Sequence, residues 1–170
     1  MEPLIDFVDA VAPWFKDLED RVHGRRHPIT VSVFGPELLK SPAFSDLIFR
    51  HPELDFASTH LYESGTIDHP RDTVATAIAA VRLIADAVVQ SSDGRPVFDS
   101  EHGPIHSYKA RRIVLSEPFD DAYFRHIQWA HLASGGAGGG MRWPNRRPHV
   151  LTKGMHSSQA ALSRMLPLID

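Results

Sequence analysis

The stretch Arg95-Pro-Val-Phe-Asp-Ser-Glu-His-Gly103 is a short apolar run that ends on an acidic residue, a histidine and a glycine. A run of this length predicts a β-strand that buries Val97 and Phe98 and carries Glu101 to its C-terminal end. In α/β enzymes the reactive groups lie at the C-terminal ends of the strands. Glu101 is therefore the leading candidate for a catalytic carboxylate. Taken alone, it fits equally well a structural glutamate that caps a helix or pairs with an arginine.

Strands and helices alternate along the rest of the chain. Four runs of strand length are separated by longer segments that carry apolar residues at spacings of three and four. The predicted strands are Ile29–Phe34, Leu54–Tyr62, Pro96–Glu101 and the stretch that ends on Met141-Arg142-Trp143. The predicted helices are residues 4–22, 37–50, 71–90, 119–134 and 156–166. Strict alternation implies parallel strands joined by right-handed crossovers, and hence an α/β fold.

Two segments leave a local choice open. Pro13 either kinks the first helix or marks its first turn, because proline is well tolerated only there. The run Gly135-Gly-Ala-Gly-Gly-Gly140 holds five glycines in six positions, a composition typical of a flexible linker. The sudden Met141-Arg142-Trp143 that follows favours instead a tightly packed strand that emerges at a site.

Composition predicts one folding unit over residues 1–170. The chain has 170 residues, 42% of them hydrophobic, with 18 basic and 21 acidic residues and no cysteine. Since no long run of one charge appears, we expect neither nucleic acid nor a membrane surface as the main partner. Glu2, Asp6 and Asp9 interrupt the apolar run that a signal peptide needs, and no stretch approaches the ~20 apolar residues of a membrane span. The chain as given is therefore expected to be cytoplasmic, unless a segment precedes it.

Polar and aromatic side chains stand near the ends of all four predicted strands. The C-terminal ends of parallel strands meet on one face, so these residues are expected to form a pocket. His60 and Tyr62 are two positions apart and point to the same side of their strand, where they can hydrogen-bond an adjacent carboxylate. A buried core histidine at position 60 and a packing role for Trp143 remain open alternatives.

Four segments together resemble strands five to eight of a (β/α)8-barrel glycoside hydrolase, of the retaining clan that includes the family 5 cellulases and mannanases. They match that family in order and in spacing. The segments are His27-Pro-Ile-Thr-Val-Ser32, Asp55-Phe-Ala-Ser-Thr-His-Leu-Tyr62, Arg95–Gly103 and Met141-Arg-Trp143. The resemblance implies hydrolysis of an oligosaccharide or polysaccharide through a covalent glycosyl-enzyme, without a metal or another cofactor.

The resemblance also implies individual roles around the predicted pocket. Glu101 matches the nucleophile that attacks the anomeric carbon. His60 and Tyr62 match the pair that orients this nucleophile and contacts the sugar, and His102 is a further candidate for substrate binding. Trp143 matches the aromatic residue that floors the subsite next to the scissile bond.

The departure from the family pattern lies in the N-terminal half. A complete barrel runs to about 250 residues, and strands one to four have no counterpart in this chain. Glu2 stands close to the place of the acid/base residue, although Met1 replaces the asparagine that precedes that residue in the family. The chain therefore resembles a C-terminal half-barrel, a fragment with two open sheet edges. We expect it to self-associate or to be completed by a missing N-terminal half.

Two other functions compete with the glycosidase. A metal-dependent hydrolase would use His60, His102, Asp99 or Glu101 as ligands, although no closely spaced histidine pair stands on a strand or helix end. A non-catalytic carbohydrate-binding remnant would keep the aromatic and histidine residues of the pocket and lack the acid/base residue. Oligosaccharide binding without hydrolysis would select this last alternative.

Overall fold

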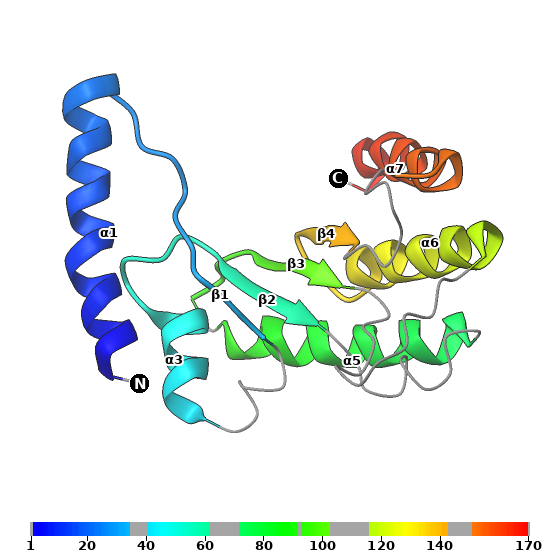
Figure 1. Cartoon of the computed structure of the whole chain (residues 1–170), viewed down its shortest axis with the longest axis horizontal. Helices are drawn as coiled ribbons and strands as arrows, with labels where there is room; N and C mark the ends of the chain where they lie inside the picture. The colour runs from blue at the N-terminus through cyan, green and yellow to red at the C-terminus, as the bar shows by residue number, and fades with distance from the viewer. Residues whose placement is uncertain are drawn as a thin grey trace.

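The structure, a computed structural model, describes residues 2–34, 41–61, 72–91, 93–102, 116–142 and 151–169. In these ranges the chain forms a four-stranded sheet, alternating with helices, in which every neighbouring pair of strands is parallel (Figure 1). The strands are β1 (Ser32–Phe34), β2 (Ala57–Leu61), β3 (Val97–His102) and β4 (Gly138–Arg142). The predicted α/β class and the four predicted strands are thereby confirmed.

The helices follow the predicted order, with small shifts at their ends. They are α1 (Glu2–His23), α3 (Pro42–Arg50), α5 (Thr73–Gln90), α6 (Glu117–Ala133) and α7 (Lys153–Met165), followed by the 3-10 turn η1 (Leu166–Leu168). Residues 37–40 of the second predicted helix lie outside the described residues. Helix α1 runs through Pro13, so this proline does not mark a first turn. Pro13 lies on the exposed side of α1, where water can satisfy the carbonyl group that the missing N–H leaves without a partner.

The strand order is β1-β2-β3-β4, so each strand pairs with the next one along the chain. Right-handed crossovers between sequential parallel neighbours put the connecting helices on one face of the sheet. Accordingly, α5 packs against α6 and α6 against α7. This arrangement is consistent with half of a (β/α)8 barrel. The face that these helices cover is called the helix face below, and the opposite face, against which no helix of the described ranges packs, the helix-free face.

The hydrophobic core lies on the helix face of the sheet. Its main cluster joins Ile48 and Phe49 of α3, Ile84 of α5, Ala57 of β2 and Val97 of β3. All five are at most 2% exposed. These contacts hold α3 and α5 against β2 and β3.

Helix α5 is long and apolar enough, by length and composition alone, to cross a membrane. In the fold it buries Ile84 and Ala87 against the sheet. A helix that covers a parallel sheet needs such an apolar face. The core contacts of α5 account for part of its apolar composition, whereas Val74, Ile78 and Val89 are at least 50% exposed.

The glycine run forms a strand that packs closely against α6. Strand β4 pairs with β3, with Gly138 opposite Phe98 and Gly139 opposite Asp99. A Cβ atom on Gly139 would lie 2.4 Å from Nδ1 of His131 and 2.7 Å from Nε2 of Gln128, both on α6. Only glycine leaves room for this approach, so the packed strand, rather than the linker, is the correct interpretation of the run.

Candidate functional site at the ends of β2 and β3

His60 and Glu101 form a pair at the C-terminal ends of β2 and β3. The two residues are register partners in the parallel ladder. Nδ1 of His60 lies 3.1 Å from Oε2 of Glu101, and the two side chains are 29% and 14% exposed. His60 is thus not a fully buried core histidine. The structure brings together these two predicted site residues.

A β-bulge in β3 sets the direction of the Glu101 side chain. The register runs from Thr59 opposite Asp99 to His60 opposite Glu101, which leaves Ser100 as an extra residue. In a regular strand Asp99 and His102, three positions apart, would face opposite sides. Both instead lie among residues of α6, on the helix face. Ser100 and Glu101 therefore share the helix-free face, as the extra residue of a bulge allows.

Hydroxyl groups line the helix-free face beside this pair. Oγ of Ser32 lies 3.0 Å from Oγ of Ser58 and 2.8 Å from Oγ of Ser100, so one residue from each of β1, β2 and β3 takes part. Phe98 precedes these groups on β3 and is only partly buried, whereas Val97 is 2% exposed. The prediction that the strand buries both residues is confirmed for Val97 alone, because Phe98 points away from the helices.

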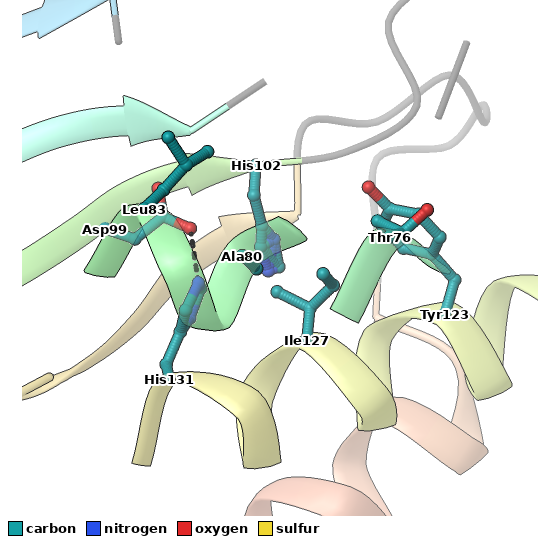
Figure 2. A pocket seen from close by; sticks show the side chains of 8 residues that line it. All are labelled: Thr76, Ala80, Leu83, Asp99, His102, Tyr123, Ile127 and His131. Atoms are coloured by element: carbon teal, nitrogen blue, oxygen red, sulfur yellow. Dashed lines mark ion pairs between the residues drawn. The ribbon is translucent and has the colours of Figure 1, made fainter. Parts of the chain in front are cut away.

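The helix face of β3 carries a second group of polar side chains (Figure 2). Oδ2 of Asp99 lies 3.0 Å from Nε2 of His131 on α6, and both side chains are 0% exposed. They border a cavity of about 10 Å³ between β3, α5 and α6, to which His102, Tyr123 and Thr76 also contribute. This volume is close to the least that one water molecule needs, so the cavity cannot admit a sugar.

His102 belongs to this helix-face group and not to the Glu101 pair. Its side chain is 1% exposed. Nε2 of His102 accepts a hydrogen bond from Nε2 of Gln128 at 3.3 Å, and its ring packs edge-on against Phe124 at a centroid distance of 6.0 Å. The sheet thus separates His102 from the His60–Glu101 pair, and its role in substrate binding stays a prediction.

The structure does not describe the side chains of three other predicted site residues, Glu2, Tyr62 and Trp143. Glu2 is the first residue of α1, whose N-terminal end lies on the side of the molecule away from β4 (Figure 1). The side chain of Glu2 lies outside the described residues, as do Tyr62 and Trp143 entirely.

The four ligands considered for a metal-dependent hydrolase do not converge. His60 and Glu101 lie on the helix-free face, whereas Asp99 and His102 lie on the helix face. Within the described ranges no group of three or more histidine, aspartate or glutamate residues is arranged to hold a metal ion.

Sequence reasoning missed Ser100 and His131. A signal for His131 exists in the sequence, since Tyr123, Ile127 and His131 follow one another at intervals of four on the buried face of α6. A histidine in such a row requires a buried polar partner, and Asp99 in the middle of an apolar strand has the same requirement. No comparable signal marks Ser100, because the bulge depends on the pairing of β3 with β2.

Comparison with models of protein families, with curated proteins and with solved structures finds no match to this chain.

Proposed function

We propose that the chain carries the nucleophile side of a retaining glycoside hydrolase, with Glu101 as the nucleophile. The observation that carries the proposal is the His60–Glu101 pair, 3.1 Å apart, on the helix-free face at the C-terminal ends of two adjacent parallel strands. Reactive groups of (β/α)8-barrel enzymes lie at this end of the strands. The partial exposure of both side chains leaves them accessible to a ligand.

The reaction proceeds in two displacements. A carboxylate oxygen of Glu101 bonds to the anomeric carbon while the glycosidic C–O bond breaks, and the leaving oxygen takes a proton from an acid. Water then attacks the same carbon, gives a proton to the conjugate base of that acid, and frees the Glu101 carboxylate. Glu2 is the candidate for this acid/base role, which requires a separation of about 5 Å between the two carboxyl groups.

His60 orients the nucleophile in this mechanism. An imidazole N–H donated to Oε2 of Glu101 fixes the orientation of the carboxylate relative to β2. Tyr62 and Trp143 complete the proposed sugar site as a hydroxyl donor and an aromatic platform.

The test is covalent labelling with activated 2-deoxy-2-fluoroglycosyl fluorides of glucose, mannose and cellobiose. Fluoride leaves without help from a general acid, so labelling examines Glu101 independently of the acid/base residue. We expect one added glycosyl group in the intact mass, on the peptide that contains Glu101. The Glu101→Gln variant should not be labelled. Glu117→Gln, at an exposed position of α6, is the matched control and should be labelled like the unmodified chain.

A label on another residue, or equal labelling of Glu101→Gln, would remove the nucleophile assignment. Oligosaccharide binding without any labelling would favour the carbohydrate-binding remnant. Tight binding of zinc or manganese with thermal stabilisation would favour the metal-dependent hydrolase.

A further inference from the structure

We propose that Ser100 is a positioning residue that fixes the bulge of β3 and thereby holds the Glu101 carboxylate beside His60. The inference deepens the proposed function, because its catalytic consequence rests on Glu101 acting as the nucleophile. Its structural part concerns only the relation between Ser100, Glu101 and His60.

A bulge needs something that decides which residue is the extra one. Asp99 and His102 are held on the helix face by His131 and Gln128, so the chain between them must accommodate two residues on the helix-free side. In the pairing with β2, either Ser100 or Glu101 can be the unpaired residue in that interval, whereas the ladder with β4 passes through it without a shift. If the bulge moved by one position, Ser100 would stand opposite His60 and the carboxylate would shift along the strand.

The hydroxyl group of Ser100 ties the bulge to β2. Oγ of Ser100 donates a hydrogen bond to the backbone carbonyl of Thr59 at 3.2 Å. Thr59 is the last residue before the register shift, and it is 0% exposed. A buried carbonyl group at a disrupted ladder benefits from a side-chain donor. This bond joins Ser100, as the extra residue, to the point where the pairing changes.

The neighbouring hydroxyls give this bond a fixed direction. A serine hydroxyl has one proton to donate. Since Ser100 donates to Thr59, the 2.8 Å contact requires Ser32 to donate to Ser100, and the 3.0 Å contact then requires Ser58 to donate to Ser32. The three hydrogen bonds therefore run in one direction, from Ser58 of β2 to Ser32 of β1, then to Ser100 of β3, and finally to a backbone carbonyl group of β2. Donors that polarise one another in sequence strengthen the last bond.

The test compares the full chain with four variants by NMR, with the ring resonances of His60 as the reporter. Glu101→Gln gives the displacement caused by loss of the carboxylate charge. We expect Ser100→Ala to move the His60 ring resonances by about the same amount, because the hydroxyl that pins the bulge is gone. Ser58→Ala is the matched control, since it removes a hydroxyl of the same network that bonds to Ser32 and not to the Thr59 carbonyl. It should move these resonances far less.

Ser100→Thr keeps the hydroxyl and should restore the His60 resonances of the unmodified chain. Unmoved resonances in Ser100→Ala, or equal displacement in Ser58→Ala, would overturn the proposal. Chemical unfolding of each variant shows whether the fold is retained. If Ser100→Ala does not fold, Ser100→Thr decides the question. His60 resonances in Ser100→Thr that differ from those of the unmodified chain would then overturn the proposal.

A second readout links the position of Ser100 to chemistry. The rate of labelling by the reactive fluoroglycoside should fall by about 100-fold in Ser100→Ala, as a displacement near 1 Å at a reacting group can cause. It should recover in Ser100→Thr. If the unmodified chain is not labelled at all, the proposed function fails, whereas the His60 resonances still decide the positioning role.

Discussion

The two faces of β3 show how one short strand serves two purposes. On the helix face, Asp99 is 0% exposed and pairs with His131, and His102 is packed among residues of α6. On the helix-free face, Glu101 is 14% exposed and lies beside His60. Polar residues of the first group pack against α6, whereas those of the second are partly exposed. Titratable side chains in adjacent positions of one strand thus differ in role because they differ in burial.

The difference in burial predicts that substitutions on the helix face lower the free energy of unfolding far more than substitutions on the helix-free face. Asp99→Ala should lower the free energy of unfolding by about 3–5 kcal/mol, because it leaves His131 buried without its carboxylate partner. Glu101→Gln should change it by no more than about 1 kcal/mol, since the His60–Glu101 pair is partly exposed. Urea unfolding followed by circular dichroism measures both values.

The double variant of Asp99 and His131 sharpens this test. When both partners become apolar residues of similar size, most of the loss should be recovered. If Asp99→Ala costs no more than Glu101→Gln, the assignment of a stabilising face and a ligand face is wrong.

A smaller effect is expected where β4 meets the same helix. Gly139→Ala should lower the free energy of unfolding by about 1–3 kcal/mol, because the new methyl group overlaps the His131 and Gln128 side chains. The cost should shrink in a His131→Ala background, which makes room for the methyl group. Thermal and urea unfolding of the single and double variants provide the comparison. An equal cost in both backgrounds would mean that the overlap with His131 is not the cause.

The smallest effect concerns the loop that leads into β3, at the end of the strand away from the Asp99–His131 and His60–Glu101 pairs. Side-chain and backbone hydrogen bonds from Arg95 lower the pKa of the Asp93 carboxyl group from 3.8 to about 2. A lowered pKa in the folded state means that the pair stabilises the fold above pH 3.8 and loses this contribution as the pH falls through about 2.

In Arg95→Gln the pKa of Asp93 should rise toward 3.8, which an NMR titration of the carboxyl carbon measures. Arg26→Gln, which removes the partner of Asp20 instead, should leave the Asp93 titration unchanged. A low Asp93 pKa that persists without Arg95 would contradict the stated cause.

The fold could be predicted from the sequence because its signals are local. The spacing of Ile84 and Ala87 on α5 and the β-branched residues before Phe34 each reflect burial on one side of a single element. Alternation of such elements then limits the topology to a parallel sheet. Even the glycines of β4 could be interpreted, since Met141 and Arg142 follow them directly.

The orientation of the site could not be predicted in the same way. Counted from Val97 with a period of two, Glu101 falls on the helix face together with Asp99. The bulge reverses this assignment, and it arises from pairing with Thr59 and His60, far away in the sequence. His102 follows Glu101 directly in the sequence, and only its contact with Gln128 shows that it lies in the helix layer.

The extra residue in β3 has a consequence for how such a strand can change in length. Without Ser100, Thr59 would still stand opposite Asp99 and His60 opposite Glu101, in an unbroken ladder with β2. The shift would then lie in the ladder with β4, where Gly139 stands opposite Asp99 and Met141 opposite Glu101. A strand one residue shorter would therefore present the same carboxylate to the same side. The insertion contributes local curvature and an additional hydroxyl group beside the carboxylate. Strands with and without this residue thus offer the same carboxylate and differ in the shape of the surface around it.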